Sequence, residues 1–286
     1  MSTHTIKMSA KEIQALELKL KGAENKKTPP YALFQKKTSD CTITAYESGK
    51  VVFQGEGAAF YAGAIPAKAI PKKYPESGSD EVGTGDYFGP IVVCATYVKE
   101  SDLPLLNSLK IQDSKQLKDE DIIKIAPPLM QQLTYSLLVL ENTKYNEIHK
   151  TTNMNAIKAK LHNQAFLHLE KKVGHPLDHI IIDQFTPEPS YYRYLNDEKE
   201  IMKNIHFETK AENKYLSVAC GSIIARFTFL EALKQMSEKY DFDFPKGAGA
   251  HVDEAGVEFV KDHGWDIMYQ VCKYHFKNSE KIKEAL

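Results

Sequence analysis

Two adjacent carboxylates followed by a glycine turn are the residues of this sequence best suited to chemistry. Asp80 and Glu81 are neighbours, and Gly83-Thr84-Gly85 follows directly, ahead of the apolar run Ile91–Val98. Neighbouring carboxylates repel each other unless a cation compensates their charge, and a divalent metal would do so. Glycines let the backbone approach a ligand closely. The segment predicts a cation site beside a ligand-contacting loop, and a hairpin turn with solvated acids is the alternative.

Two more acids stand where a sheet edge or a helix start would present them. Asp183 ends the apolar run His179–Ile182, which is typical of a buried strand, and Glu212 precedes a long helical segment. Carboxylates delivered to a sheet edge are suited to hard cations. The alternatives are that Asp183 caps the next turn and that Glu212 is a solvated acid near Lys214.

Alternating strands and helices must position these acids, because the chain from Ser77 onward changes repeatedly between β-rich and helical patterns. Strands are predicted at Ile91–Val98, Thr134–Glu141 and His179–Asp183, and helices at Ser114–Met130, Met154–Val173, Ser217–Tyr240 and Asp253–His263. This order predicts an α/β layer domain.

The first part of the chain has a different pattern. Ser9 and Glu12 form a capping box at the start of a predicted helix. Three short β-prone runs follow, at Tyr31–Lys37, Cys41–Tyr46 and Val51–Gln54. A small α+β domain is therefore expected over residues 1–66, with a linker at 67–76 and the larger domain at 77–286.

Charge is distributed unevenly along the chain. Residues 1–75 carry 12 lysines and six acids, a net charge of +6, while the remainder carries −7, so the total is −1. A basic module beside an acidic body favours binding of a polyanion. A chance excess of solvated lysines is the alternative.

Membrane insertion and a disulfide scaffold are not expected. Uninterrupted apolar stretches are only a few residues long, and the first residues lack the apolar core of a signal peptide. The four cysteines are scattered, without a C-x-x-C pair. Reduced core thiols and a cytoplasmic location are therefore predicted.

Five segments, taken in order, resemble the type 2 ribonuclease H superfamily. They are Asp80-Glu81-Val82-Gly83-Thr84-Gly85-Asp86, Asp113-Ser114-Lys115, Ile182-Asp183-Gln184-Phe185, Lys210-Ala211-Glu212 and the helical run Ser217–Arg226. Ribonuclease HII usually has Gly-Arg-Gly in the loop and an aspartate as the fourth acid. Gly83-Thr84-Gly85, Glu212 and the extra N-terminal module are instead similar to ribonuclease HIII.

The resemblance implies a fold and a catalytic site. The fold would be a ribonuclease H-like domain, with a central mixed sheet and flanking helices, preceded by a domain similar to the TATA-box-binding-protein fold. The catalytic, metal-binding residues would be Asp80, Glu81, Asp183 and Glu212, holding two Mg²⁺, with Mn²⁺ as a substitute. Two such ions activate a water and neutralise the leaving oxygen of a phosphodiester.

The resemblance also implies how substrate is held. Gly83, Thr84 and Gly85 would contact the 2′-hydroxyl that distinguishes RNA from DNA. Backbone phosphates would be contacted by Ser114, Lys115 and Ser222.

The expected activity is hydrolysis of the RNA strand of RNA/DNA hybrids, leaving 5′-phosphate and 3′-hydroxyl ends. The alternatives are cleavage at single embedded ribonucleotides, as in ribonuclease HII, and a catalytically silent hybrid-binding protein. We expect a monomer with the hybrid duplex as its partner, and the sequence does not identify protein partners.

Overall fold

The computed structural model describes residues 3–20, 22–62, 73–111 and 117–286. The chain divides between Pro71 and Lys72 into two compact units. Ser114, Lys115 and the first part of the predicted linker lie outside the described residues.

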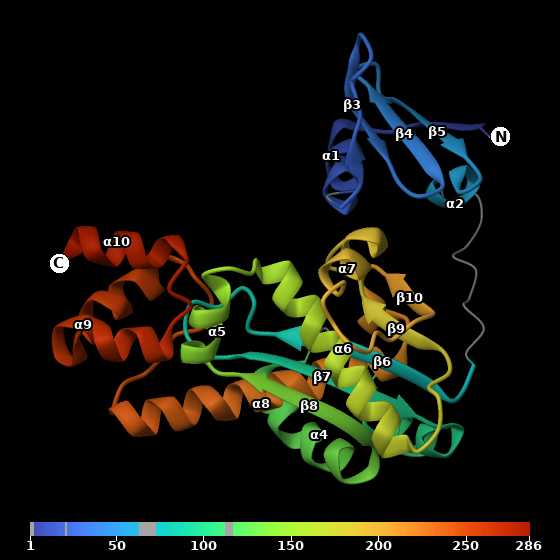
Figure 1. Ribbon diagram of the computed structural model, residues 1–286. Coiled ribbons are helices and arrows are strands. Elements are labelled where there is room, and N and C mark those ends of the chain that lie inside the picture. The colour runs from blue at the N-terminus through green and yellow to red at the C-terminus, as the bar shows by residue number, and fades with distance from the viewer. Residues whose placement is uncertain (1–2, 21, 63–72, 112–116) are drawn as a thin grey trace. The chain divides into compact units, whose positions relative to one another are not determined.

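The first unit contains one five-stranded antiparallel sheet (Figure 1). Its elements are β1 (Thr3–Lys7), α1 (Ala10–Lys19), β2 (Glu24–Asn25), β3 (Ala32–Lys37), β4 (Cys41–Tyr46), β5 (Lys50–Gly55) and α2 (Ala58–Tyr61). The strand order is β1-β5-β4-β3-β2. The three predicted strands are present as β3, β4 and β5, whereas β1 and β2 were not predicted.

Helix α1 begins at the predicted capping box and covers one face of this sheet. The Ser9 hydroxyl accepts a hydrogen bond from the Glu12 N–H, and the Glu12 carboxylate accepts one from the Ser9 N–H at 2.7 Å. Ile13 packs with Ile43 and Phe53 in a buried cluster. Because strand side chains alternate, their neighbours Thr42 and Gln54 belong to the opposite face.

The second unit is built on a mixed five-stranded sheet, as expected. The strands are β6 (Glu76–Val82), β7 (Ile91–Val98), β8 (Thr134–Leu140), β9 (Ile180–Asp183) and β10 (Ile205–Glu208), in the order β10-β9-β6-β7-β8. Strand β9 runs parallel to β6 and β10, whereas β7 runs antiparallel to β6 and β8.

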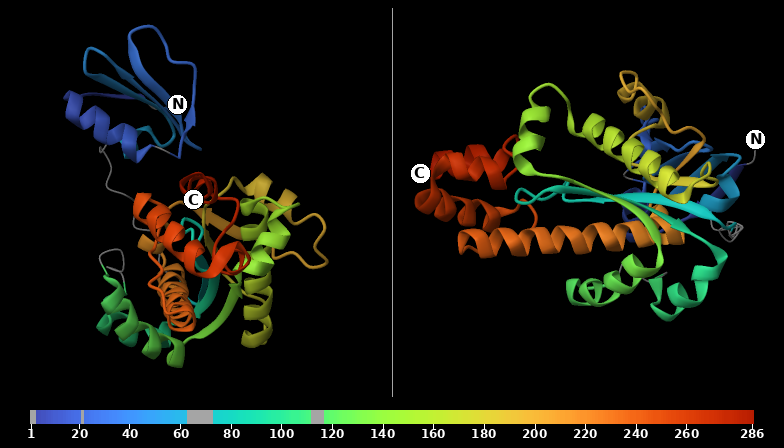
Figure 2. Two further views of the ribbon diagram at one scale, coloured as in Figure 1. Left: turned by 90° about the vertical axis from the view of Figure 1, so that its left-hand side faces the viewer. Right: turned by 60° about the horizontal axis from the view of Figure 1, so that its bottom comes forward.

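Helices cover both faces of this sheet, with α6 on one side and α4 and α8 on the other (Figure 2, right). The helices are η1 (Glu100–Asp102), α3 (Leu103–Ser108), α4 (Asp119–Gln132), α5 (Asn142–His149), α6 (Met154–Val173), α7 (Glu188–Tyr194), η3 (Ala211–Asn213), α8 (Leu216–Tyr240), α9 (Ala250–Val271) and α10 (Lys277–Ala285).

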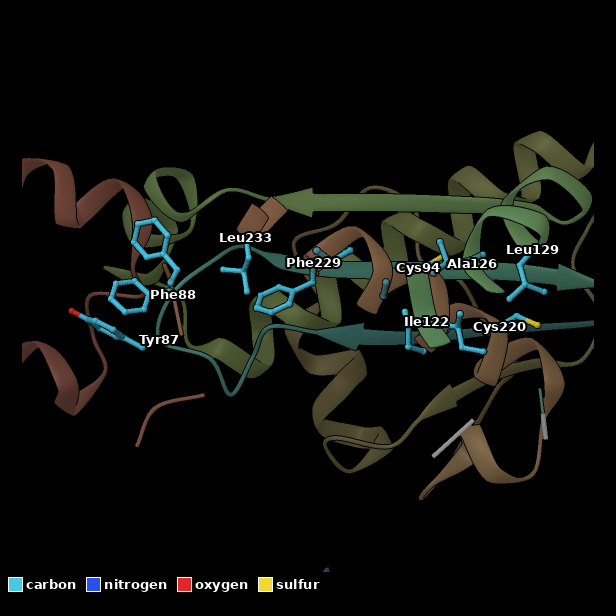
Figure 3. Close-up of a cluster of buried hydrophobic side chains, with 14 of the residues drawn as sticks. Tyr87, Phe88, Cys94, Ile122, Ala126, Leu129, Cys220, Phe229 and Leu233 are labelled. Carbon is cyan, nitrogen blue, oxygen red and sulfur yellow. The ribbon is translucent and has the colours of Figure 1, made fainter. Parts of the chain in front are cut away.

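Strand β7 is buried over its whole length because both of its faces are covered. Val93 joins the cluster under α6, whereas Cys94 joins the cluster under α4 and α8. Figure 3 shows the cluster under α4 and α8, in which Cys94 and Cys220 lie near Ile122 of α4. The alternation along one strand thus divides the interior into two cores, one on each side of the sheet.

Helix α8 corrects the expectation that no segment is long enough to span a bilayer. Its 25 residues have a mean hydropathy of 1.5 in the most apolar window. By length and composition it qualifies, alone among the residues that the structure describes. That window is 61% buried, and α8 packs on β6 and β7, so the apolar residues form core contacts.

Other boundaries differ from the prediction for local reasons. The described part of the helix predicted at Ser114–Met130 is α4, which begins at Asp119. The helix predicted at Asp253–His263 continues to Val271 through a break at Gly264, where φ is 78°. Sequence reasoning missed the strands β6 and β10 and the short helices α3, α5, α7 and α10.

Candidate active site

Three of the predicted acids line one cavity at the sheet edge. The cavity has a volume of about 260 Å³, and its lining residues are Asp80, Ile122, Asp183, Glu212, Ser222, Ile223 and Arg226. Strands β6 and β9 are parallel, and Ser79 lies opposite Ile182. Asp80 and Asp183 each follow one of these paired residues, so the sheet register places the two carboxylates side by side.

Glu212 is brought to this edge by the turn after β10. Glu208 lies opposite Asp183 in the parallel pair of β10 and β9. The chain then passes through Lys210, at φ 55°, into the short helix η3. The Ala211 N–H donates a hydrogen bond of 2.8 Å to Asp183 Oδ1, which fixes η3 against β9. Glu212 therefore enters the cavity from the third of three segments far apart in sequence.

Ser222 reaches the cavity because α8 approaches the sheet unusually closely. A Cβ atom at Gly221 would lie 2.8 Å from the Cys94 carbonyl oxygen and 3.6 Å from the Asp80 nitrogen. Only a glycine permits that approach. One residue further along α8, the Ser222 hydroxyl hydrogen-bonds the Asp80 carboxylate.

The acids of the cavity disfavour one another's ionisation. Burial, and then the charges of Glu81 and Asp183, raise the pKa of Asp80 to about 8, although the Ser222 hydrogen bond opposes this. Burial, together with the charges of Glu212 and Glu81, also raises the pKa of Asp183 against the Ala211 hydrogen bond. Such shifts are expected where carboxylates share a site without a cation.

Glu81 lies apart from these acids and is not among the residues that line the cavity. Asp80 lies opposite Cys94 and Glu81 opposite Val93, which belong to the cores on different sides of the sheet. The two acids therefore project from opposite faces of β6. A metal site that used both side chains would need a break in this alternation, whereas the register of β6 with β7 is regular here.

Two side chains of α6 hold the Glu81 carboxylate. Lys158 Nζ forms a close ion pair with Oε1, and His162 Nε2 lies 2.9 Å from Oε2. The other His162 nitrogen, Nδ1, lies 2.7 Å from Ser79 Oγ. Burial alone would raise the pKa of Glu81, but the His162 hydrogen bond and electrostatic interactions with His162 and Lys158 lower it.

The aromatic ring of Phe185 supports both of these partners. It stacks on the His162 ring at 5.4 Å between centroids, and Lys158 Nζ lies 4.0 Å from its centroid. This network keeps Glu81 charged without a metal. Sequence reasoning noted the residues of α6 but did not pair them with Glu81, because their partner lies on another element.

The predicted glycine loop is a tight turn at the end of β6. Gly83 is buried and has a φ of 93°, and a Cβ there would lie 2.2 Å from the Pro90 carbonyl oxygen. Gly85 is exposed, and a Cβ there would meet nothing within 4 Å. The Asp86 N–H closes the turn on the Gly83 carbonyl at 3.4 Å. Gly83 is thus required by the fold, whereas Gly85 is not, because a side chain at Gly85 would have open space around it.

Arg226 lines the cavity but is committed to an ion pair. Its Nε and Nη2 atoms donate to Asp119 Oδ1 at 2.9 and 2.5 Å, and Nη1 donates to the Leu117 carbonyl at 3.1 Å. Lys246 also pairs with Asp119. These contacts fix the start of α4 against α8 and give Arg226 a structural partner.

Comparison with known proteins identifies the family. The family model described as Ribonuclease HII matches residues 77–279, and a model of a domain of unknown function matches residues 3–75. Ribonuclease HIII of Bacillus pumilus is 46% identical over 90% of this chain and 91% of the relative. Ribonuclease HIII of Bacillus subtilis is 41% identical over 99% and 97%, respectively.

This chain belongs to the ribonuclease HIII family. Membership confirms the resemblance carried by the five sequence segments, and it makes the chain an endonuclease of the ribonuclease H class. A solved ribonuclease HIII has the same fold. The crystal structure of Bst-RNase HIII in complex with Mn²⁺ is 38% identical, with a TM-score of 0.72, and the match covers 99% of each chain.

Proposed function

We propose that this ribonuclease HIII family member hydrolyses the RNA strand of RNA/DNA hybrids by two-metal chemistry, leaving 5′-phosphate and 3′-hydroxyl ends. The cavity shared by Asp80, Asp183 and Glu212 carries this proposal. Three carboxylates from separate segments would not be brought together at one sheet edge without a cation to offset their repulsion.

The donors of the cavity suit a hard divalent cation. They are carboxylate oxygens with one hydroxyl, and the pKa of Asp80 is raised by burial and then by neighbouring charges, both of which a bound cation would offset. Within the described residues, no three His, Cys, Asp or Glu side chains already form a metal cage. Mg²⁺ commonly keeps several waters and uses few protein ligands, so a preformed cage is not required.

Bst-RNase HIII in complex with Mn²⁺ supports a divalent metal here. Asp80, Asp183 and Glu212 would hold the metal from the cavity. The resemblance also implied Glu81 as a metal ligand, but its carboxylate projects from the other face of β6 and is bound there by Lys158 and His162. When bound, divalent cations would supply an activated water and neutralise the leaving oxygen.

Substrate contacts follow from the surroundings of the cavity. The exposed backbone at Thr84 and Gly85 would contact the 2′-hydroxyl, with Gly83 shaping the turn. Ser222 would orient Asp80 and contact a phosphate. Ser114 and Lys115 stay predicted phosphate contacts.

The N-terminal unit would bind the hybrid through the sheet face opposite α1. Gln54 and Lys37 of that face are exposed, and Thr42 is partly exposed. Lys50, at the start of β5, is also exposed, whereas Lys36 is only 8% exposed and is therefore unsuited to contact a phosphate. Contacts to phosphates alone would bind without reading sequence. We further propose that the enzyme acts as a cytoplasmic monomer.

A cleavage assay on a labelled hybrid tests this function. We expect cleavage that requires added Mg²⁺ and ends in 5′-phosphates. Asp183→Asn should lower kcat more than about a hundredfold, because a metal's charge stabilisation is worth several kcal/mol. Asp178→Asn, at an exposed aspartate just before β9, is the matched control and should retain activity. A hybrid that stays uncut at saturating Mg²⁺ would leave only a hybrid-binding protein.

The number of consecutive ribonucleotides in the substrate distinguishes the proposed activity from the ribonuclease HII type of activity, which the match to the Ribonuclease HII family model keeps open. A duplex with four consecutive ribonucleotides should be cut much faster than one with a single ribonucleotide. Preference for the single ribonucleotide would favour the ribonuclease HII type of activity.

A further inference from the structure

The segment that follows the glycine turn is held by the end of α9. Phe88 and Cys272 form an antiparallel bridge. The Lys273 N–H donates to the Tyr87 carbonyl at 2.7 Å, and the Gly89 N–H donates to the Val271 carbonyl at 3.0 Å. The exit of the turn is therefore fixed by main-chain pairing to a distant part of the chain.

The Lys273 side chain adds a buried cation to this contact. Its exposed fraction is 0%, and Nζ donates to the Asp86 carbonyl at 2.8 Å and the Gly89 carbonyl at 2.5 Å. No carboxylate of the described residues forms an ion pair with it. Both acceptors belong to the segment leaving the turn. Burial lowers the pKa of Lys273 to about 7, a sign of how costly the charge is in this place.

Asp86 completes the contact from its side chain. The Gly247 N–H donates to Asp86 Oδ1 at 2.6 Å, and the Tyr87 N–H donates to the Gly247 carbonyl at 2.8 Å. Asp86 thus joins three groups: its N–H closes the turn on Gly83, its carbonyl accepts from Lys273, and its carboxylate accepts from Gly247.

We propose that Asp86 and Lys273 are positioning residues that hold the Gly83–Asp86 turn in the shape that recognises the ribose of the RNA strand. This inference rests on the proposed function of that turn. Burying a lysine against main-chain carbonyls costs free energy of desolvation, whereas an apolar side chain would pack there without that cost. One of its acceptors is the carbonyl of Asp86, the residue directly after the exposed Gly85.

Replacing Asp86 or Lys273 should weaken recognition of the substrate and leave the chemical step unchanged, since neither residue lines the acidic cavity. A loosened turn would have to be ordered again at each binding event, so the hybrid would bind more weakly. Once the hybrid is bound, the carboxylates of the cavity are unchanged. A purely structural role would instead lower the active fraction, which reduces kcat and leaves KM as it was.

Full-length variants test this on a labelled hybrid. Asp86→Ala should raise KM about tenfold with kcat within twofold of the wild type, because a hydrogen bond to a charged acceptor is removed. Asp86→Asn keeps an acceptor oxygen and should restore KM to within about threefold. Lys273→Met should raise KM similarly, whereas Lys277→Met, at an exposed lysine of α10, is the matched control.

A second readout uses no metal. With a chelator present, fluorescence anisotropy should show that Asp86→Ala binds the hybrid more weakly while its affinity for a DNA duplex changes little. Asp86 is partly exposed, so its variants keep the test decisive if Lys273→Met does not fold. A wild type that does not cut the hybrid overturns the proposed function. A wild type that cuts it, with unchanged KM in Asp86→Ala, overturns only this inference.

Discussion

The two glycines of the turn should respond differently to the same added methyl group. Gly83 has a φ of 93°, and its new Cβ would lie 2.2 Å from the Pro90 carbonyl oxygen. The new Cβ at Gly85 would meet no atom within 4 Å, and its φ lies outside the left-handed region. The free protein therefore tolerates Gly85→Ala, and any loss of function must come from an approaching ligand.

The magnitudes separate the two variants. Gly83→Ala should destabilise the protein by at least about 1–2 kcal/mol from its φ alone, and the contact with Pro90 adds to this. That corresponds to a Tm lower by roughly 2–8 °C. Gly85→Ala should stay within about 0.5 kcal/mol of the wild type. If the Gly85 backbone contacts the ribose, the methyl group should raise KM for the hybrid about tenfold, through the loss of roughly 1–2 kcal/mol of binding.

Thermal unfolding and steady-state cleavage of a labelled hybrid measure both quantities. Gly22→Ala is the matched control, because a Cβ at Gly22 also meets nothing within 4 Å and its φ is likewise outside the left-handed region. An unchanged KM in Gly85→Ala would refute contact between this turn and the substrate. A lower Tm in that variant would refute the steric reasoning itself.

Three further changes have calculable directions. Lys158→Met breaks an ion pair whose side chains are 9% and 10% exposed, so urea unfolding without metal should show a free energy of unfolding lower by about 3 kcal/mol. The control is Lys150→Met, in a pair whose side chains are 61% and 52% exposed, and it should lower that free energy by under about 1 kcal/mol. The double variant Lys37→Gln, Lys50→Gln should lessen the slope of log affinity against log salt by about one for each phosphate that it no longer neutralises, and an unchanged slope would exclude both lysines. Burial lowers the pKa of His275 to about 4, so between pH 6.5 and 4 the unfolded chain binds a proton at this residue more readily than the folded protein does. The free energy of unfolding should therefore fall as the pH is lowered through that window, and it should fall less in His275→Gln. Urea unfolding at several pH values measures this.

Asp183 could be found from the sequence because it ends a recognisable apolar run, whereas the strand that carries Asp80 and the strand before Glu212 were not predicted. The apolar run before Asp183 predicted β9, and the parallel pairing of β9 with β6 then brings Asp183 beside Asp80. For such a residue, its place at the end of an apolar run in the sequence is enough. The alternation of strands and helices predicted an α/β layer domain, whereas the mixed sheet was expected only from the family resemblance.

The partners of Glu81 could not be predicted in the same way. Lys158 and His162 are polar residues on a helix, and only the packing of α6 against β6 shows that they meet a carboxylate there. Lys273 is a single lysine without a motif, and its role depends on a bridge between segments far apart in the chain. β1 has an alternating, mostly polar pattern and forms through backbone pairing with β5, which composition does not reveal.

The opposite orientation of Asp80 and Glu81 makes the pairing of β6 with its neighbours a determinant of activity. Strand side chains have a period of two, so a slip by one residue would exchange the two acids between faces. In a slip that brings Glu81 to the place of Asp80, Asp80 takes the place of Ser79, which lies beside His162. A deletion inside β6 should therefore disturb the acids and the packing together, because a side chain would then stand where only Gly78 fits against Ser217.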